Sequence, residues 1–408
     1  MASIVDYLRE GTRIFLSGWS ARISGDYKFQ GDSEQICQEI VSSCFNQKYS
    51  FFQTSLRNFP QFWTRDFSWC VQPLLDLGYQ KQVHQTLSYA LQSFMDANKV
   101  TTTISPSGKP FDFPYFASDS LPLLMFSIQK TKFDYQEYIS FLNKEIIRYS
   151  FKVIDKKTNL VRFDRHFSSI KDFAKRKSAC YDNVMLYVLQ RAIEDLNDSR
   201  LLSLSKNSTW YKNQIVEQFY NSDQGFFYED MAKKNHLAAD ANIFPLIYGL
   251  IEEKSIIKKI NFIIQKEKLD HPLPLRYTKN KQNAKFIAQE IFLKDYESTS
   301  LWAHMGILWT LFLLEQQNSK LKQQGEEYFL SFTKIIQTHH GFPEVLNNKT
   351  NIDNNANNYN NSNNNIDNNN IDNNNNNNNL FKTPFYYADN TMLWASIYLQ
   401  ASKLLSNY

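Results

Sequence analysis

The spacing of apolar residues predicts a protein built almost entirely from helices. Apolar positions recur every three or four residues in twelve segments, the spacing that places them on one face of an α-helix. The chain has only 11 glycines and 11 prolines in 408 residues, so few residues are available for tight turns and hairpins. The predicted helices are 33–45, 66–77, 80–97, 119–131, 135–150, 180–196, 206–222, 239–252, 254–265, 298–316, 319–338 and 388–405.

An even number of helices with short connections indicates how they pack. Short loops make neighbouring helices antiparallel, so twelve helices would form six hairpins. Six hairpins in a ring make an (α/α)6 toroid barrel, and we predict this all-α fold as a single domain over residues 1–408. An α-solenoid is the alternative, but the chain shows no clear internal repeat of roughly 34 to 47 residues, which weakens it.

One long polar segment interrupts the helical pattern near the C-terminus. Residues 347–379 are nearly all asparagine, with scattered aspartate, isoleucine, serine and tyrosine. Such a segment buries too little apolar surface to offset the entropy lost when a chain becomes ordered. We therefore predict a disordered insertion in a loop of the helical domain.

Composition and charge exclude several classes of partner. Hydrophobic residues make up 42% of the chain, which is enough for a large core. The 45 basic and 41 acidic residues are dispersed, without the dense basic block that nucleic-acid binding requires. No run approaches the ~20 apolar residues of a membrane span, and the start, "MASIVDYLREGTRIFLSGW", carries charges where a signal peptide has its apolar region. We expect a cytoplasmic protein without nucleic-acid or membrane partners, and the oligomeric state stays open.

Metal and cofactor patterns are absent from the sequence. The four cysteines form no CxxC pair and lie near apolar residues, which predicts reduced thiols in the core. His339 and His340 are adjacent, so on a helix they would point apart and make a poor metal pair. The chain has neither an HExxH motif nor a glycine-rich phosphate loop. We therefore expect no metal and no cofactor.

Acidic residues in aromatic or apolar surroundings recur at the predicted helix junctions. In "FWTRDFSW", residues 62–69, Arg65 and Asp66 stand among four aromatic side chains. In a ring of hairpins the loops at one end form a funnel, so these acids can converge on one pocket. Aromatic rings stack on the apolar faces of sugars, and carboxylates bond to their hydroxyl groups. The acids are Asp66, Asp119, Asp164, Asp172, Asp182, Asp240, Glu297, Glu344 and Asp389.

The order of these stretches resembles the six-hairpin glycosidases, which include glucoamylases and the amylo-α-1,6-glucosidase domain of glycogen debranching enzyme. "FWTRDFSW" is similar to the stretch that grips the terminal sugar in that group, and "YFASDSLPLLMFSI" resembles a debranching-type helix start. "SSIKDFAKRKSACYDN" resembles the segment with the general acid, and "GFPEVL" resembles the proline–glutamate that supplies the base. "DYESTSLWAHMG" is similar to a late tyrosine–tryptophan stretch, with "ESTS" where relatives often have glycines.

The resemblance implies that Asp172 is the general acid and Glu344 the general base of an inverting site. Inverting glycosidases hold these two carboxyl groups ~6.5–9.5 Å apart. Asp182 stays open as an alternative acid, because "CYDNVML" also resembles the acid-bearing stretch of a related family. Cations near Asp172 would lower its pKa if they pointed inward, whereas a general acid needs a raised pKa, so we expect them to face outward. These cations are Lys171, Lys175, Arg176 and Lys177.

Each candidate for substrate binding also has a structural interpretation. Arg65 and Asp66 can form a salt bridge at a helix start, with Asp66 as the N-cap residue. The other acids can cap helices, and the histidine and tryptophans can pack in the core. Tyr296 and Glu297 are evenly balanced between site and core. The residues that we predict to contact substrate are Trp63, Arg65, Asp66, Asp119, His166, Asp240 and Trp302.

The sequence thus predicts an inverting glycoside hydrolase that releases a terminal sugar, with glucose as the first candidate. The expected substrate is an α-linked di- or oligosaccharide. The alternative is a catalytically inactive protein of the same fold that binds carbohydrate or serves as a scaffold. Hydrolysis requires Asp172 and Glu344 to face one pocket, with Arg65 and Asp66 at its floor.

Overall fold

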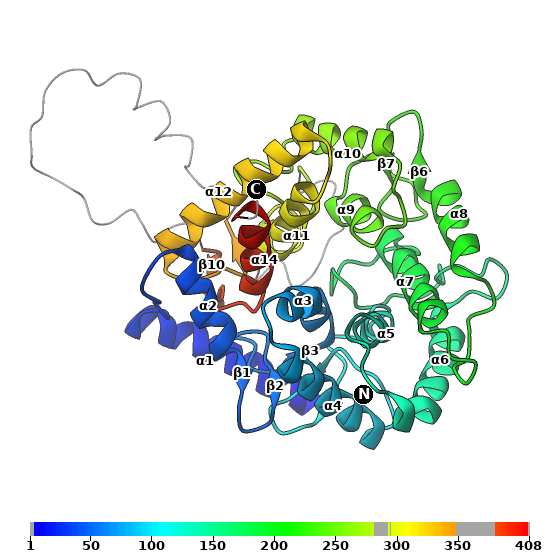
Figure 1. Ribbon diagram of the computed structural model, residues 1–408, viewed down its shortest axis with the longest axis horizontal. Coiled ribbons are helices and arrows are strands. Elements are labelled where there is room, and N and C mark those ends of the chain that lie inside the picture. Colours follow the sequence, from blue (N-terminus) through cyan, green and yellow to red (C-terminus); the bar gives the residue numbers. More distant parts are fainter. Residues whose placement is uncertain (1–3, 281–292, 294, 348–379, 407–408) are drawn as a thin grey trace, which may run out of the picture.

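The helices of the computed structural model form a ring with an inner and an outer layer (Figure 1). The structure describes residues 4–280, 293, 295–347 and 380–406, so the Asn-rich segment, predicted as disordered, lies outside the described residues apart from Asn347. The inner helices are α3 (Thr64–Asp76), α5 (Ser120–Thr131), α7 (Cys180–Leu196), α9 (Ala239–Ile247), α11 (Ala303–Leu314) and α14 (Ala395–Ser406). The outer helices are α2 (Ser33–Ser43), α4 (Gln80–Asp96), α6 (Ile139–Val153), α8 (Ser208–Phe219), α10 (Lys254–Lys266) and α12 (Ser319–His339).

Contacts between the inner helices close the ring. Each inner helix packs against the next one along the chain, from α3 through α5, α7, α9 and α11 to α14, and α14 packs back against α3. The outer helices α4, α6, α8, α10 and α12 each pack on the inner helix that precedes them, and α2 packs on α14. Every predicted helical segment overlaps one of these helices, although several bounds differ by a few residues. The contact between α14 and α3 also contradicts a solenoid, in which the first and last units stay apart.

One helix, α1 (Ile4–Ser24), was not predicted from the sequence. Charged residues stand between its apolar residues, and Leu16, Trp19 and Ile23 are exposed, so the segment lacks the buried stripe that marks the other helices. The Arg22 guanidinium fixes its C-terminal end, because it donates hydrogen bonds to the backbone carbonyls of three residues near the C-terminus of the chain. These residues are Thr383, Pro384 and Tyr386.

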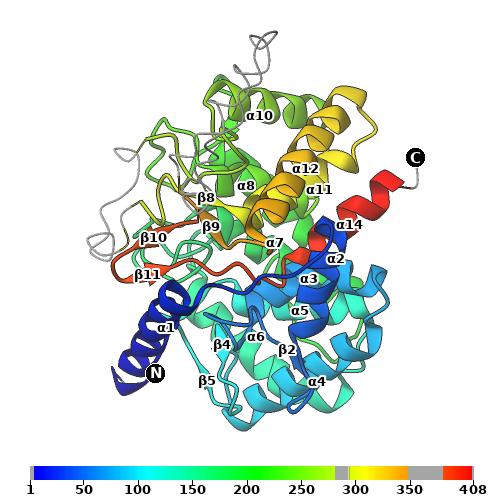
Figure 2. The ribbon, with the colours of Figure 1, turned by 90° about the vertical axis from the view of Figure 1, so that its left-hand side faces the viewer.

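Short antiparallel strands order the loops that precede the inner helices. They are β1 (Phe45–Asn46) with β2 (Phe51–Phe52), β3 (Phe62–Trp63) with β4 (Thr103–Ile104) and β5 (Pro110–Phe111), β6 (Tyr220–Asn221) with β7 (Phe226–Phe227), β8 (Leu301–Trp302) with β9 (Val345–Leu346), and β10 (Lys382–Thr383) with β11 (Tyr386–Tyr387). In Figure 2, β4, β5, β8, β9, β10, β11 and α1 lie on the side away from the C-terminal end of α14. Because β3 leads into α3 and β8 into α11, these strands fix where both helices begin.

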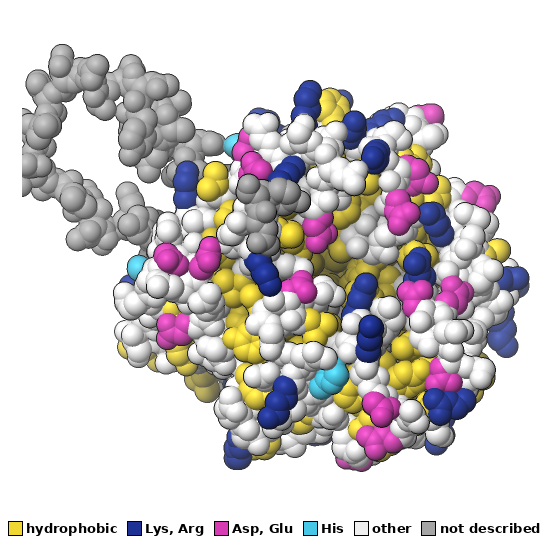
Figure 3. Space-filling view, viewed as in Figure 1, with side chains coloured by type: hydrophobic (Ala, Val, Ile, Leu, Met, Phe, Trp, Pro, Cys, Tyr) yellow, Lys and Arg dark blue, Asp and Glu magenta, His cyan; other side chains and the backbone are white. Residues whose placement is uncertain are grey.

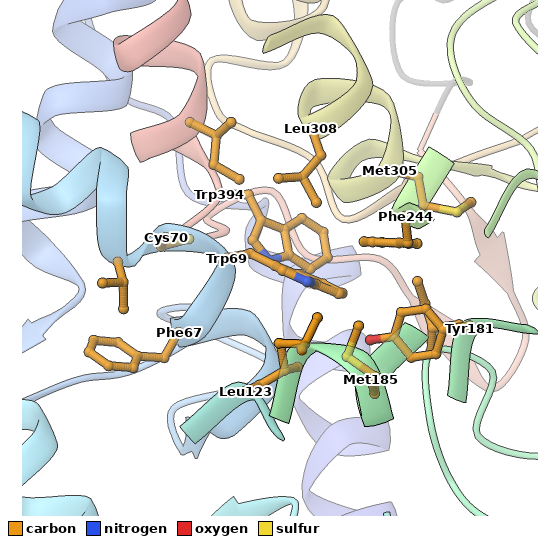
Figure 4. Close-up of a cluster of buried hydrophobic side chains, with 14 of the residues drawn as sticks. Phe67, Trp69, Cys70, Leu123, Tyr181, Met185, Phe244, Met305, Leu308 and Trp394 are labelled. Atoms are coloured by element: carbon orange, nitrogen blue, oxygen red, sulfur yellow. The ribbon is translucent and has the colours of Figure 1, made fainter. Parts of the chain in front are cut away.

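The centre of the ring is filled by side chains from all six inner segments (Figure 4). Trp69 lies there, with its ring centroid 6.4 Å from that of Trp394. The four cysteines are free and buried, which confirms the prediction of core thiols. The labelled members of this central cluster are Phe67, Trp69, Cys70, Leu123, Tyr181, Met185, Phe244, Met305, Leu308 and Trp394.

The surface carries charges of both signs. On the face seen in Figure 3, lysine and arginine side chains are interspersed with aspartate and glutamate. Among the described helices, none combines the length and the apolar character that crossing a bilayer requires. A cytoplasmic location and the treatment of residues 1–408 as one domain stay predictions from the sequence.

The close approach of α11 to a neighbouring loop can be tested at Gly306. A Cβ atom at this position would clash with the Pro274 carbonyl group and with the Phe332 ring. We expect Gly306→Ala to lower the free energy of unfolding by about 1–3 kcal/mol, the usual cost of overpacking. Gly11→Ala is the control, because a Cβ there meets no atom within 4 Å, and alanine in a helix stabilises by roughly 0.5–1 kcal/mol. Chemical denaturation measures both, and wild-type stability for Gly306→Ala would contradict the close approach.

Candidate functional site

A cavity of about 350 Å³ lies at the end of the ring where the short strands gather. Strands β3, β8 and β11, the starts of α3 and α11, and the loop between α6 and α7 all contribute to its wall. Trp69 and Trp394 belong both to this wall and to the central cluster, so the cavity ends against the filled centre of the ring. Six of the predicted site residues line it: Trp63, Arg65, Asp66, Asp172, Trp302 and Glu344.

Arg65 and Asp66 are adjacent, but their side chains bond in different directions. Trp63 occupies the N-cap position of α3, so the interpretation of Asp66 as the N-cap residue was wrong. Asp66 lies in the first turn, where its Oδ1 accepts a hydrogen bond of 3.1 Å from Trp394 Nε1. Burial raises the pKa of Asp66 to about 7, against the attraction of Arg65. Asp66 therefore holds a proton more readily than an exposed aspartate.

Asp119 lies behind the cavity wall rather than on it. It stands at the N-cap position of α5 without a side-chain capping bond, and it is fully buried. Its carboxylate accepts hydrogen bonds from Arg65 Nε at 2.7 Å and from the Tyr181 hydroxyl at 3.1 Å. Arg65 Nη2 also lies 3.8 Å from Asp172 Oδ1. Asp119, predicted to contact substrate, does not line the cavity, and it holds the arginine that faces the cavity.

Asp172 reaches the cavity from the loop between α6 and α7. Its Oδ1 accepts a hydrogen bond of 2.7 Å from the Ser168 hydroxyl. Burial raises the pKa of Asp172, and the repulsion of Asp119 adds to this effect, whereas Arg65 and the Ser168 hydrogen bond oppose it. The pKa of Asp172 is therefore raised overall, as a general acid requires.

Two of the four cations around Asp172 point inward, which contradicts the expectation that all would face outward. Lys171 and Arg176 are buried, while the other two lysines are exposed. Lys171 Nζ lies 2.7 Å from Glu229 Oε1, and Arg176 Nη1 lies 2.8 Å from Asp240 Oδ2. These carboxylates balance both charges, and the pKa of Asp172 stays raised. Asp240, predicted to contact substrate, belongs to this buried ion cluster and does not line the cavity.

Glu297 fixes the backbone of the segment that carries Asp172. Its carboxylate accepts hydrogen bonds from three consecutive backbone N–H groups, those of Asp172 at 2.9 Å, Phe173 at 3.1 Å and Ala174 at 3.1 Å. Burial raises the pKa of Glu297 to about 7, and repulsion from Asp172 contributes. The sequence left Glu297 evenly balanced between site and core, and the structure places it directly behind the site.

Glu344 is buried in the cavity wall and held by three donors. The Tyr296 hydroxyl donates to its Oε1 at 2.8 Å, the Tyr386 hydroxyl donates to its Oε2 at 2.6 Å, and the backbone N–H of Asp389 donates to Oε2 at 3.1 Å. Strand β9 begins at the next residue and pairs with β8, which places Glu344 beside Trp302. Burial raises the pKa of Glu344 to about 7, although the tyrosine hydroxyls oppose the shift.

Two further candidates lie outside the cavity wall. Asp182 is buried in the first turn of α7, where burial raises its pKa to about 6, against the attraction of Arg176. His166 packs edge-to-face against the Tyr115 ring, with 5.3 Å between the ring centroids. Neither residue lines the cavity, so its geometry favours Asp172 over Asp182 as the acid.

His304 lines the cavity, although the sequence did not assign it to the site. Its ring stacks on Trp69 with centroids 4.7 Å apart, and it also lies against Trp302 and Trp394. Burial lowers the pKa of His304 well below its usual range, so the ring is neutral. Within the described residues neither ring nitrogen has a hydrogen-bond partner, and the same holds for Trp63 Nε1. Such buried polar atoms are available to a ligand.

The described residues contain no group of three or more histidine, cysteine, aspartate or glutamate side chains arranged to hold a metal ion. Among the described residues that line the cavity, the charged groups are three carboxyl groups and one guanidinium. This arrangement provides proton donors and acceptors beside aromatic surfaces, which is a chemistry suited to a neutral polyhydroxylated ligand.

Comparisons with solved structures identify proteins of the same mostly helical fold. A glycosidase variant in complex with glucose matches with a TM-score of 0.59 and 9% identity, over 92% of this chain and 97% of that one. A rhamnosidase from Klebsiella oxytoca with rhamnose bound has a TM-score of 0.56 and 10% identity, over 91% and 64%. A mannosylglycerate hydrolase from Thermus thermophilus has a TM-score of 0.54 and 10% identity, over 92% and 100%. No family model and no curated protein matches the chain.

The raised pKa of Asp66 predicts a pH-dependent gain in stability for Asp66→Asn. An aspartate has a pKa of about 3.9 in an unfolded chain, so the stabilising effect of the folded-state proton is present below about pH 4 and is lost as the pH rises through about 7. Asparagine keeps the acceptor for Trp394 without the charge. We expect Asp66→Asn to raise the free energy of unfolding relative to wild type. This gain should be larger at pH 8 than at pH 5 by at least about 1 kcal/mol.

Denaturant titrations at pH 5 and pH 8 measure this difference. Asp164→Asn is the control, because it makes the same change at an aspartate whose side chain is largely exposed. We expect the control to show no such gain at pH 8. An effect of Asp66→Asn that is equal at both pH values would contradict the raised pKa.

Proposed function

We propose that this protein is an inverting glycoside hydrolase with an (α/α)6 toroid fold, which removes a terminal sugar from an α-linked di- or oligosaccharide. Glucose is the first candidate for that sugar. One observation carries the proposal: Asp172 and Glu344 line the same cavity, together with Arg65, Asp66 and several aromatic rings. The ring of inner helices, each covered by an outer helix, supports the toroid assignment. The glycosidases of similar fold support the class of reaction.

Asp172 would act as the general acid. It donates its proton to the glycosidic oxygen as the bond between that oxygen and the anomeric carbon breaks. Its raised pKa favours the protonated form before the reaction. After the transfer, Arg65 at 3.8 Å attracts the new carboxylate, and the Ser168 hydroxyl can bond to it. The leaving group departs as a neutral alcohol.

Glu344 would act as the general base. It accepts a proton from a water molecule, whose oxygen bonds to the anomeric carbon on the face opposite the leaving group. The configuration of the anomeric carbon is therefore inverted. The Tyr296 and Tyr386 hydroxyls orient the Glu344 carboxylate. Because both hydroxyls donate to it, they also favour its charged form, which the base needs before the reaction.

The closed inner end of the cavity supports removal of a terminal residue. Trp69 and Trp394 stop the cavity at the central cluster, so a sugar chain can enter only by one end. Arg65 and the unpaired ring nitrogens of His304 are placed to bond sugar hydroxyl groups. Trp302 offers a flat apolar wall to the sugar ring.

Substitution of the two carboxylates tests the proposed chemistry. We expect Asp172→Asn and Glu344→Gln each to lower kcat by roughly 10²–10⁴-fold, the usual contribution of general acid–base catalysis. Turnover should be measured with maltose, isomaltose, trehalose, kojibiose and limit dextrin. Asp164→Asn is the matched control, because this exposed aspartate precedes Asp172 in the same loop and pairs with Arg162.

Time-resolved NMR of the released sugar gives the anomer and tests inversion. Equal turnover by wild type and both variants would refute the roles of Asp172 and Glu344. Sugar binding without turnover by the wild type would instead support the inactive binding protein that the sequence left as the alternative.

The pKa of Glu344 predicts the acidic side of the pH profile. The base must be deprotonated, and burial raises its pKa to about 7 in the free protein. We expect kcat/KM to fall about tenfold per pH unit at pH values well below 7. Initial rates between pH 4 and pH 9 at low substrate concentration measure this limb. A kcat/KM that stays constant down to pH 5 would contradict the assignment of Glu344 as a base with a raised pKa.

A further inference from the structure

The outer part of the cavity differs from its inner part in chemistry. The charged side chains among the described lining residues are Arg65, Asp66, Asp172 and Glu344, which surround the proposed catalytic centre. Apart from Gly11, Asp172 and Tyr296, the described lining residues that are half-buried or exposed are apolar, and we call six of them the apolar rim. The apolar rim consists of Ile14, Phe59, Trp63, Phe113, Phe173 and Phe385.

Four rings of the apolar rim form a continuous arc. Phe59 meets Trp63 edge-to-face with centroids 5.8 Å apart, and Trp63 meets Phe113 in the same way, also at 5.8 Å. Phe113 then meets Phe173 at 6.5 Å and an angle of 79°. Each contact has the geometry that aromatic pairs prefer. The arc is therefore assembled from three separate segments of the chain and forms one surface.

The arc ends beside the proposed acid. Phe173 follows Asp172 in the chain, and its backbone N–H is held by Glu297 at 3.1 Å. In the proposed reaction Asp172 protonates the oxygen of the leaving group, so that group must lie next to Asp172 and hence near Phe173. The remaining rim residues come from α1, through Ile14, and from the turn between β10 and β11, through Phe385.

We propose that the apolar rim is the binding site for the leaving group, and that it selects a single neutral ring with an apolar face, such as an aryl group or a pyranose. This inference rests on the proposed function and names the leaving-group class for the same site. An anionic leaving group is disfavoured, because a carboxylate or phosphate would lose hydration against these rings, and among the described residues the rim offers no cation to pair with it. Trp63 Nε1, buried and without a partner in the described structure, can donate to a hydroxyl of a neutral sugar.

Three substrates with one sugar and different leaving groups separate this inference from the proposed function. α-Glucosyl fluoride has almost no leaving group to bind, so it reports on the catalytic centre alone. Phenyl α-glucoside and 4-carboxyphenyl α-glucoside differ by one para carboxylate group, which is negatively charged. We expect wild-type kcat/KM to be at least about tenfold higher for the phenyl compound, even though carboxyphenolate is no poorer a leaving group than phenolate.

Variants at Phe113 test the rim directly. We expect Phe113→Ala to lower kcat/KM for phenyl α-glucoside at least about fivefold and to change that for the fluoride less than about twofold, because only the former stacks on the ring. Phe113→Lys places a cation in the rim, and we expect the ratio of carboxyphenyl to phenyl kcat/KM to rise at least about tenfold. Tyr115→Ala is the control: Tyr115 stands two residues along the same segment, is 49% exposed, and does not line the cavity.

Each outcome has a distinct meaning. Hydrolysis of the fluoride without a preference for the phenyl compound, or with no shift in Phe113→Lys, overturns the rim as the leaving-group site and leaves the proposed function intact. Failure to hydrolyse all three substrates counts against the proposed glucosidase. In that case, calorimetric titration with phenyl and methyl α-glucoside decides the inference: tighter binding of the phenyl compound in wild type but not in Phe113→Ala supports the rim, and equal binding overturns it.

Discussion

The pairing of Arg65 with Asp119 is the interaction on which the site depends. A buried guanidinium is costly unless carboxylates compensate its charge. Asp119 supplies that compensation at 2.7 Å, and Tyr181 bonds to the same carboxylate, so the pair joins α3, α5 and α7 at the level of the cavity. The other end of Arg65 faces Asp172. The Arg65 guanidinium, which helps to hold these three helices together, therefore also attracts the carboxylate of the proposed acid, Asp172.

The two proposed catalytic carboxylates are held in different ways. Glu297 fixes the backbone on the C-terminal side of Asp172, so the Asp172 side chain is positioned through its own main chain. Glu344 is held directly by two tyrosine hydroxyls and a backbone N–H group. Both sets of bonds come from residues far away in sequence. Correct placement of each carboxylate thus depends on segments that meet only in the folded chain.

Local spacing was sufficient to predict the inner and outer helices of the ring but not α1, because a buried stripe depends only on neighbouring turns and α1 lacks one. It could not show that Asp119 lies behind the cavity wall whereas Asp172 lines it, since both are acids in aromatic surroundings and their contacts with Arg65 join segments far apart in the sequence. The inward direction of Lys171 and Arg176 was missed for a similar reason. Their partners Glu229 and Asp240 lie 58 and 64 residues further along the chain, and no local pattern shows such pairs.

The packing of α14 against α3 has a consequence for biosynthesis. Trp63 and Arg65 are made early, whereas Glu344, Tyr386 and Trp394 are made late, and all five line one cavity. A nascent chain that has emerged only as far as α12 lacks three of these side chains and the helix that joins the ends of the ring. Before α14 is made, the aromatic side chains around α3 lack the helix that packs against one side of them. The newly made protein therefore acquires its site and the final shielding of its apolar interior in the same late step.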